Sequence, residues 1–359
     1  MRSTLKIITR VSNEIRKSIN GVRYSSVALT KPVKLLIVVD RKNWAYDSIA
    51  SGLIKNKPAQ WCNVGIDIHY LKHSQIRLED ISRHYDTIFF MGWQNLARIE
   101  EEKIIENYPS IPKSKIAVGI HSHHAWDMQN TLPNKSIKPP SCLVDYLNQF
   151  RAVNAVSERL YRLFVDAGME NLHLTNNGVD SSIFLPFATR DWSKKRQLVC
   201  GFSGNNMHDW RKGIQEIIEP ATKNAFALLK KATPALEATL TLRDMPNFYR
   251  DLDLYLCASK SEGFSLSVLE AASCGIPIIS TNVGGCDQLI NHGLNGFIVD
   301  RKIPAFVEKI RYLAENPEVL AEMSENIRRD VEEKWAWDIR APDWFKFLER
   351  AMPAIDVSA

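Results

Sequence analysis

The sequence lacks an apolar run long enough to cross a bilayer. Its longest runs, such as Leu35–Val39, fall far short of the roughly 20 residues that a membrane-spanning helix needs. It also lacks an internal repeat and a low-complexity tract, and its net charge is only +5. No RNA- or DNA-binding motif is present, so we expect no nucleic acid as a partner.

Close cysteine pairs are absent as well. None of the six cysteines belongs to a Cys-x-x-Cys motif, and the nine histidines form no His-Glu-x-x-His or Cys/His set. A zinc site is therefore not expected. Because Cys200 and Cys257 lie in apolar runs, we interpret the cysteines as reduced, mostly buried thiols of a cytosolic protein.

What is present is the composition of a soluble globular protein. The 359 residues are 45% hydrophobic and 24% charged, which is ordinary for such a chain. This length allows two domains and a sizeable core.

Residues 1–31 differ from the rest of the chain. Residues 1–26 hold six Lys or Arg and one acidic residue, and apolar residues recur there every three or four positions. This basic amphipathic pattern fits a helix packed on the body or an anchor on a membrane surface. An organelle transit peptide is a third interpretation.

From residue 33 onward, apolar runs alternate with helical patterns. The strands expected in the first half are Val33–Val39, Val64–Tyr70, Thr87–Met91, Ile116–Ile120, Ala152–Val156 and Leu172–Thr175. The helices expected between them include Trp44–Lys55 and Glu158–Ala167, the second capped by Ser157. This alternation predicts a parallel, doubly wound α/β sheet.

A second sheet of the same kind is expected after a turn-rich boundary near residue 188. Its strands are expected at Leu198–Phe202, near Ala238–Leu242, and at Leu252–Cys257 and Ile276–Ser280. The closing helices are expected at Ile303–Asn316, Pro317–Lys334 and Pro342–Ala351. Two such domains imply a cleft between them, which is a common place for a ligand.

Two carboxylates stand out in the second sheet. Glu262 follows an expected strand and Glu270 lies on the helix after it, and Gly275 and Pro277 end that helix. A ligand of such a strand–helix–strand unit sits at the carboxyl end of the strand, against the helix N-terminus. Both carboxylates are therefore expected at one pocket mouth, beside backbone N–H groups suited to a phosphate.

This stretch resembles the donor-site signature of the retaining glycosyltransferases of family four, which have the GT-B fold. The resemblance is carried by Glu262-Gly-Phe264, Leu269-Glu-Ala271, Gly275-Ile-Pro277 and Gly284-Gly285, with seven residues between the carboxylates. Further similar stretches are Ser157-Glu158, Asn177-Gly178-Val179-Asp180, Phe202-Ser-Gly204, Lys212-Gly213 and Asn295-Gly296-Phe297. The resemblance covers the chain well from about residue 150 to its end, but it covers the first domain only weakly.

The resemblance implies a role for each side chain. Glu270 would bind the ribose hydroxyls of the nucleotide, because a carboxylate accepts from both of them. Glu262 would face the donor sugar, and Lys212 with Arg211 would neutralise the leaving nucleoside diphosphate. His121 would face the acceptor side of the cleft.

The resemblance also assigns backbone groups to the donor. The turn and helix start at Gly263, Phe264, Ser265 and Leu266 would meet the diphosphate or the sugar, and Gly204 would lie beside them. No metal and no other cofactor is then expected, because the lysine and the helix dipole supply the positive charge.

The implied architecture has two Rossmann-like domains facing each other across a cleft. Its parts are the basic segment 1–31, an acceptor-side domain at 32–187, a donor domain at 188–334 and a C-terminal helix at 335–359 that returns to the first domain. The implied activity is transfer of a sugar, with retention, from a nucleotide-diphosphate sugar to a hydroxyl of a glycan, a glycolipid or a cell-surface polysaccharide precursor. We expect a cytoplasmic location, with peripheral contact of residues 1–26 with the inner membrane face as a further interpretation.

Several alternatives stay open. The protein could be another GT-B enzyme, such as a nucleotide-sugar epimerase or a phosphorylase, or an inactive sugar-nucleotide-binding partner subunit. The inactive partner subunit stays an alternative because the loop Asp40–Trp44 lacks the glycine pair that the family often has there. A further departure from the family pattern is Asp287-Gln288, which replaces the usual Pro-Glu. His123 is a rival of His121 for the acceptor-side role.

Three other features have structural interpretations. We interpret Asn177 and Gly178 as residues that supply unusual backbone angles. Asp251-Leu-Asp253 runs straight into a strand and is interpreted as a strand start, not as a metal site. The tryptophans at 335, 337 and 344 are interpreted as packing anchors.

Overall fold

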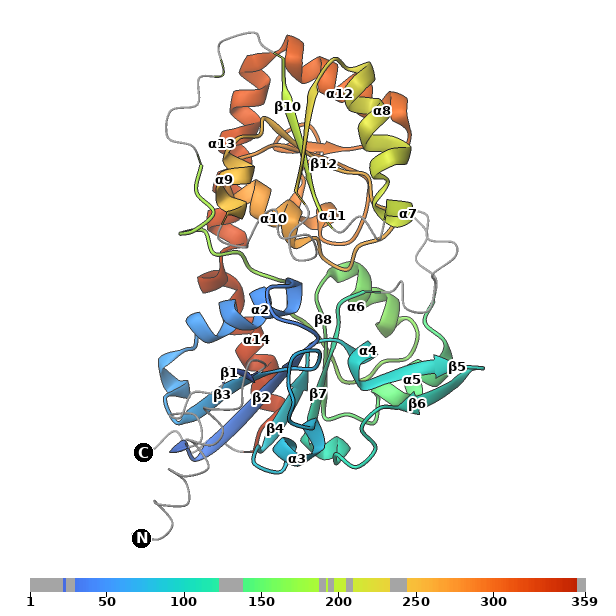
Figure 1. The fold of residues 1–359 in the computed structure, drawn as a ribbon, viewed down its shortest axis with the longest axis vertical. Coiled ribbons are helices and arrows are strands. Elements are labelled where there is room, and N and C mark those ends of the chain that lie inside the picture. Colours follow the sequence, from blue (N-terminus) through green and yellow to red (C-terminus); the bar gives the residue numbers. More distant parts are fainter. Residues whose placement is uncertain are drawn as a thin grey trace.

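The chain forms two α/β units, one above the other along the long axis of the molecule (Figure 1). The computed structural model describes residues 22–23, 30–122, 138–186, 192, 197–204, 209–232 and 244–353. Most of the basic N-terminal segment, His123 and the strand expected near 238–242 lie outside these ranges. Within them, no helix combines the length and the apolar character that a membrane crossing requires.

The N-terminal unit contains a seven-stranded sheet with the order β1-β3-β2-β4-β7-β8-β9. The strands are β1 (Val22–Arg23), β2 (Val33–Val39), β3 (Val64–Tyr70), β4 (Thr87–Phe90), β7 (Ile116–Ile120), β8 (Ala152–Ala155) and β9 (Leu172–Leu174). All neighbours pair in parallel except β1, which is antiparallel to β3. The continuous apolar runs predict β2 to β4 and β7 to β9 to within a residue, because a strand covered on both faces needs no polar side. Strand β1 was not expected, because it lies in the stretch 1–26 whose pattern suggested a helix.

Helices cover both faces of this sheet. They are α2 (Ala45–Lys55), α3 (Leu78–Ser82), α4 (Trp93–Leu96), α5 (Ser141–Leu147) and α6 (Glu158–Val165), with the 3₁₀ turns Ala59–Trp61 and Lys113–Lys115. The expected cap of α6 is present, since the Ser157 hydroxyl accepts a hydrogen bond from the Leu160 N–H at 3.4 Å.

Besides β1, a hairpin of this unit was not expected from the sequence. Strands β5 (Ala97–Glu100) and β6 (Lys103–Glu106) form an antiparallel hairpin that projects from the sheet (Figure 1). Its turn residues Glu101 and Glu102 have φ of 47° and 62°. Tight hairpin turns with such angles usually carry Asn or Gly, so two glutamates give no turn signal.

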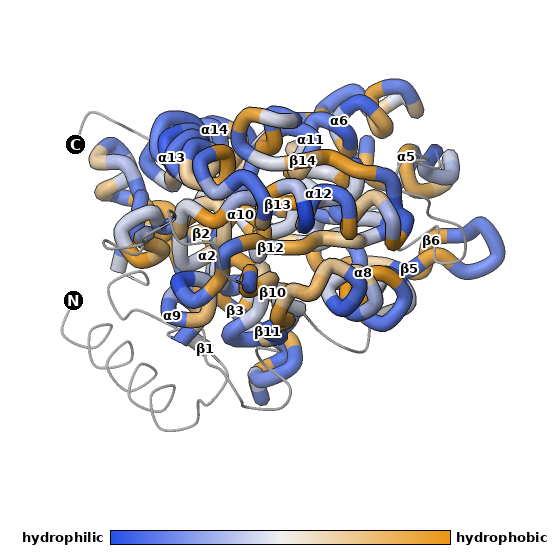
Figure 2. The backbone as a smooth tube through the Cα atoms, turned by 90° about the horizontal axis from the view of Figure 1, so that it is seen from above, coloured by the Kyte–Doolittle hydropathy of each residue, from blue (hydrophilic) through white to orange (hydrophobic). Residues whose placement is uncertain are grey.

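The C-terminal unit contains a five-stranded parallel sheet with the order β11-β10-β12-β13-β14. The strands are β10 (Val199–Ser203), β11 (Leu228–Ala232), β12 (Leu254–Cys257), β13 (Ile278–Ser280) and β14 (Gly296–Ile298). The helices are α7 (Asp209–Lys212), a π-helical turn (Ile214–Ile218), α8 (Glu219–Asn224), α9 (Met245–Arg250), α10 (Leu266–Ser273), α11 (Cys286–Leu289), α12 (Ile303–Glu315) and α13 (Pro317–Lys334). Figure 2 shows the apolar strands of this sheet between helices with hydrophilic outer turns.

The last helix, α14 (Trp337–Ala351), returns to the N-terminal unit as expected. Trp344 and Phe347 are buried against Phe89 of β4, with ring centroids 6.1 and 5.5 Å from it. The expected start of this helix at Pro342 is wrong, because the helix begins at Trp337 and Pro342 lies inside it. Proline favours a first turn, but the start is fixed instead by tertiary contacts of Trp337.

Those contacts lie where two segments of the chain, one at Val179 and one at Trp335–Trp337, connect the two units. The Val179 N–H donates to the Trp335 carbonyl at 2.9 Å, and the Trp337 N–H donates to the Val179 carbonyl at 3.1 Å. The Trp337 indole fills the space above Gly52 of α2 and Gly178, where a Cβ atom would lie 2.3 and 2.6 Å from it. The tryptophans are thus packing anchors, as the sequence indicated.

The units also touch at the rim opposite these connections. Arg159 of α6 donates to the Asn282 carbonyl at 2.9 Å and to the Asp287 carboxylate at 2.9 Å. The Glu158 N–H donates to the Gln288 side-chain oxygen at 2.9 Å. Asp287 and Gln288, which depart from the family pattern, therefore bind the first turn of α6 across the interface.

Candidate active site

The candidate site is built where β12 ends and α10 begins. After Cys257 a short turn carries Ser259 and Glu262, and α10 starts at Leu266. The first N–H groups of a helix have no partner within the helix. At the carboxyl end of a parallel sheet, they provide an anion-binding position.

Two glycines allow this turn to approach its neighbours closely. A Cβ atom on Gly263 would lie 1.6 Å from the His121 carbonyl oxygen, and one on Gly284 would lie 2.5 Å from the Glu262 carbonyl oxygen. Only glycine permits such an approach. The turn is therefore held between the end of β7 in the N-terminal unit and the loop before α11.

The Glu262 carboxylate is buried, at 8% exposure, and fully partnered. Its Oε1 accepts from Lys212 Nζ at 2.5 Å and from Ser259 Oγ at 2.6 Å, and its Oε2 lies 3.3 Å from Arg211 Nη1. Burial alone raises the pKa of Glu262, but the Lys212 and Arg211 charges outweigh it and lower the pKa to about 2. Glu262 is therefore ionised at neutral pH.

The two cations come from the end of α7. The helix stops at Gly213, whose φ of +71° suits glycine. Arg211 is held further by a 2.8 Å hydrogen bond from its Nη1 to the Ser261 carbonyl. Two cations face one carboxylate here, so the cluster keeps one net positive charge and favours an anionic ligand.

Glu270 lies in the second turn of α10 in a different environment. It is half-buried and has no cation beside it among the described residues; its Oε2 accepts a 2.7 Å hydrogen bond from the Tyr249 hydroxyl. Burial raises the pKa of Glu270 to about 7, although the Tyr249 hydrogen bond opposes the shift. The two carboxylates of one short segment therefore have opposite pKa shifts.

All of the predicted site residues line one cavity of about 440 Å³ between the units. They are Glu262, His121, Lys212, Arg211, Gly204, Gly263, Phe264, Ser265, Leu266 and Glu270. The sequence motif therefore brings together residues from both units, although their chemical roles remain predictions.

His121 lines the cavity, and its ring is turned away from the cavity into the protein interior. The ring packs edge-on to the Tyr46 ring, with centroids 4.9 Å apart. Its Nε2 lies close to Gly119, because a Cβ atom added to that glycine would be only 2.9 Å from Nε2. Burial lowers the pKa of His121 to about 3, so the imidazole is neutral. Nε2 would have to turn toward the cavity before it could act on a ligand.

The loop Asp40–Trp44 forms the N-terminal wall of the same cavity. Asn43 adopts φ of 60°, a backbone angle for which glycine is the usual choice. The Arg41 guanidinium lies 3.9 Å above the Trp44 ring. Large side chains thus line the wall where the family often has glycines.

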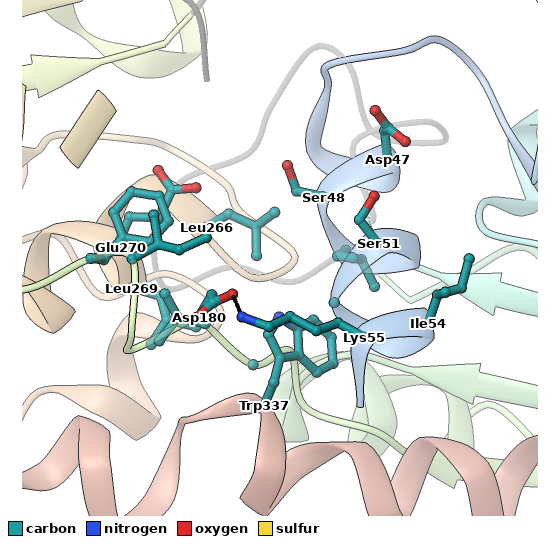
Figure 3. A pocket seen from close by; sticks show the side chains of 16 residues that line it. Asp47, Ser48, Ser51, Ile54, Lys55, Asp180, Leu266, Leu269, Glu270 and Trp337 are labelled. Atoms are coloured by element: carbon teal, nitrogen blue, oxygen red, sulfur yellow. Dashed lines mark hydrogen bonds and ion pairs between the residues drawn. The ribbon is translucent and has the colours of Figure 1, made fainter. Parts of the chain in front are cut away.

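A second cavity of about 510 Å³ adjoins the first (Figure 3). Ser48, Ile49, Leu266 and Glu270 line both cavities. Figure 3 shows Lys55 of α2 reaching across its floor to Asp180, an ion pair of 2.5 Å that links the N-terminal unit to the connecting segment. The cleft therefore extends beyond Glu270.

Sequence reasoning missed Tyr249 and Ser203, which lie behind Glu270. Tyr249 belongs to the short helix α9, whose pattern gives no functional signal. The Asp-x-Asp interpretation agrees with the structure, because buried Asp253 accepts from the Val199 N–H at 2.8 Å. Within the described ranges, no group of three or more His, Cys, Asp or Glu side chains could hold a metal ion.

Comparison with known proteins supports the fold. Residues 209–330 match the family model described as glycosyl transferases group 1. D-inositol 3-phosphate glycosyltransferase of Paenarthrobacter aurescens is 39% identical in a region covering 39% of this chain and 42% of that protein. The alignments with the first three curated relatives cover 27%, 42% and 30% of their lengths, so each match is partial.

Solved structures extend the likeness to most of the chain. Anabaena HepE in complex with UDP-glucose has a TM-score of 0.63 at 15% identity, covering 87% of this chain and 99% of HepE. Sucrose-phosphate synthase of Thermosynechococcus elongatus also has a TM-score of 0.63, at 12% identity, covering 89% of this chain and 98% of that one. The chain has the GT-B fold, as the sequence resemblance predicted.

Proposed function

We propose that this protein is a retaining glycosyltransferase that moves a sugar from a nucleotide-diphosphate sugar to a hydroxyl acceptor. The observation that carries the proposal is the ionised Glu262 carboxylate. It is held by Lys212 and Arg211 at the N-terminus of α10, in a cavity between two α/β units. The group 1 family match over the same residues supports it.

The leaving group would be stabilised by positive charge from the chain itself. Lys212, Arg211 and the N-terminus of α10 converge on the position expected for the diphosphate. We therefore propose a reaction that requires no metal ion. Turnover in the presence of EDTA should match turnover with added Mg²⁺, and a loss of activity with EDTA would contradict this part of the proposal.

The two carboxylates would divide the donor between them. Glu262, negative at neutral pH, would steady the sugar hydroxyls or the positive charge that develops on the sugar ring. Glu270 would hold the nucleotide ribose. Neither carboxylate then serves as a proton-transferring acid.

The acceptor would be a hydroxyl of a glycan, a glycolipid or a cell-surface polysaccharide precursor. We further propose a cytoplasmic location, with peripheral membrane contact through residues 1–26, because that segment is basic and amphipathic in sequence. Vesicles containing anionic lipid should bind the full chain more tightly than a chain lacking residues 1–26. Equal binding would remove the membrane contact.

Transfer assays with a panel of nucleotide sugars and hydroxyl acceptors test the activity. At least one donor should yield a glycosylated product whose anomeric configuration, read by NMR, equals that of the donor. An inverted product would contradict retention, and turnover to a sugar phosphate or an epimerised donor would favour the other GT-B activities.

A further inference from the structure

A row of buried hydroxyl groups runs behind Glu270. The Tyr249 hydroxyl lies 2.7 Å from Glu270 Oε2 and 2.9 Å from Ser203 Oγ, and Ser203 Oγ lies 3.0 Å from the Tyr255 hydroxyl. Tyr249 and Tyr255 are at most 1% exposed and Ser203 is 2% exposed. No water or ligand is needed to connect these groups, because each touches the next directly.

The direction of the hydrogen bonds follows from counting protons. An ionised carboxylate only accepts, so the single proton of Tyr249 points to Glu270. Tyr249 must then accept from the Ser203 hydroxyl. The Tyr255 hydroxyl, which also lies beside Ser203 Oγ, donates to the Ser203 carbonyl at 3.1 Å. The Ser203 N–H donates to the Tyr255 oxygen at 3.0 Å, which fixes the far end of the row at the end of β10.

The row occupies one oxygen of Glu270 and leaves the other for a ligand. Within the described part of the chain, Oε1 has no hydrogen-bond partner, and Glu270 lines the cavity. Two adjacent hydroxyls, as on a ribose ring, supply two donors to a carboxylate whose orientation is fixed. A carboxylate free to rotate would lose rotamer freedom on binding and would bind more weakly.

We propose that Tyr249 is a positioning residue that, together with Ser203, orients Glu270 for the two ribose hydroxyls of the donor nucleotide. This inference rests on the proposed function, because it takes Glu270 as the ribose ligand. Tyr249 lines the same cavity, but its hydroxyl is directed at Glu270, through which it would act.

The pH dependence of nucleotide binding follows from the same contacts. Ribose hydroxyls bind the ionised form of Glu270, whose pKa burial raises to about 7. Affinity should therefore rise as pH increases through about 7. Tyr249→Phe removes the hydrogen bond that favours ionisation, so the midpoint should move to higher pH.

The test is a binding comparison by calorimetry on the full chain. UDP, GDP and ADP are titrated into wild type, Tyr249→Phe and the exposed control Tyr312→Phe, each beside its 2′-deoxy form. For the nucleotide that wild type binds, Tyr249→Phe should weaken the ribonucleotide about tenfold and the 2′-deoxy form less than about twofold. Tyr312→Phe should leave both unchanged.

The outcomes separate this inference from the proposed function. If Tyr249→Phe weakens both forms equally, the residue is structural and the inference is wrong. If wild type does not distinguish ribo- from deoxynucleotide, the inference is wrong while a donor site remains. If wild type binds no nucleoside diphosphate, the proposed function fails as well.

A second variant covers the case in which Tyr249→Phe does not fold. Ser203→Ala interrupts the row one bond further from Glu270 and removes only a hydroxyl. It should also shift the pH midpoint of nucleotide binding upward, by less than Tyr249→Phe does. An unchanged midpoint in a folded Ser203→Ala variant would contradict the inference.

Discussion

Glu262 and Glu270 show how strongly local partners set the chemistry of one residue type. Both side chains belong to one turn and helix, and both line one cavity. Lys212 and Arg211 keep Glu262 charged, while burial without a cation raises the pKa of Glu270 to about 7. Spacing alone would equally have suggested the acid and base of a hydrolase.

Removing the Lys212 ammonium should lower the reaction rate strongly and the free energy of unfolding only slightly. We expect Lys212→Ala to lower kcat about a hundredfold, because the leaving nucleoside diphosphate loses a positive charge that stabilises it. Lys302→Ala, at a lysine side chain that is 74% exposed, is the matched control and should keep full activity. Equal kinetics for the two variants, measured as nucleoside diphosphate release, would contradict the role of Lys212.

The Glu262 ion pair should be visible in acid stability. The folded pKa of about 2 lies below the ordinary value of 4.5, so the stabilisation is present above pH 4.5 and is lost as pH falls toward 2. The wild-type advantage over Glu262→Gln should therefore shrink by about 3 kcal/mol over that range. Urea unfolding at successive pH values measures it, and a constant difference would show that the pair does not hold Glu262 ionised.

At the scale of elements, most of the central strands were predictable, but strands β1, β5, β6 and β11 were not. Val33–Val39 and Ile116–Ile120 are apolar on both faces, so their run length identifies them. The β5–β6 hairpin escaped because its turn is Glu101-Glu102. The start of α14 escaped because Val179, far away in sequence, determines it through hydrogen bonds to Trp335 and Trp337.

The candidate site divides in the same way. The two carboxylates could be found from the chain because their spacing within a strand–helix–strand unit is specific, whereas Lys212 was assigned through the family resemblance. Tyr249 and Ser203 could not, because their role depends on which strands are neighbours in the sheet. The inward turn of the His121 ring likewise depends on Gly119 and Tyr46, which only the folded packing brings together.

Helix α14 should contribute strongly to stability through Trp344. This side chain is fully buried, and its Nε1 donates to the Asn176 carbonyl at 2.8 Å. Trp344→Phe leaves that carbonyl unpaired and a small cavity, so we expect a loss of about 2 kcal/mol in the free energy of unfolding. Ile339→Ala, on an exposed position of the same helix, should change it by less than about 0.5 kcal/mol.

Chemical denaturation measures both variants. If Trp344→Phe unfolds at the same denaturant concentration as wild type, α14 is not held on the N-terminal unit by this residue. A similar loss in Ile339→Ala would instead indicate that the helix itself, and not its packing, is affected.

At the scale of the whole molecule, the cleft is bounded by contacts at two rims. The paired connections at Val179 and Trp335–Trp337 join the units on one side. Arg159 binds Asn282 and Asp287 on the other. Enzymes of two such units depend on closure to exclude water and align their substrates, so the Arg159 contacts are placed to influence that closure.

Loss of the Arg159 contacts should open the cleft. We expect Arg159→Ala to increase the radius of gyration in small-angle scattering and to raise the donor KM several-fold, with a smaller effect on kcat. Arg162→Ala is the matched control, because Arg162 lies on the same helix, is 75% exposed and pairs only with Glu158 among the described residues. The Arg159 contacts do not govern closure if both variants match wild type in scattering and in KM.

We propose that the cavity around Glu262 transfers sugar from a nucleotide-diphosphate donor. This activity is tested most directly by the rate of nucleoside diphosphate release from UDP-, GDP- and ADP-sugars with hydroxyl acceptors, for wild type and Glu262→Gln. We expect turnover of at least one donor by wild type and a loss of about a hundredfold or more in Glu262→Gln. Turnover at the same rate in both proteins, or no turnover of any nucleotide sugar by wild type, would contradict it.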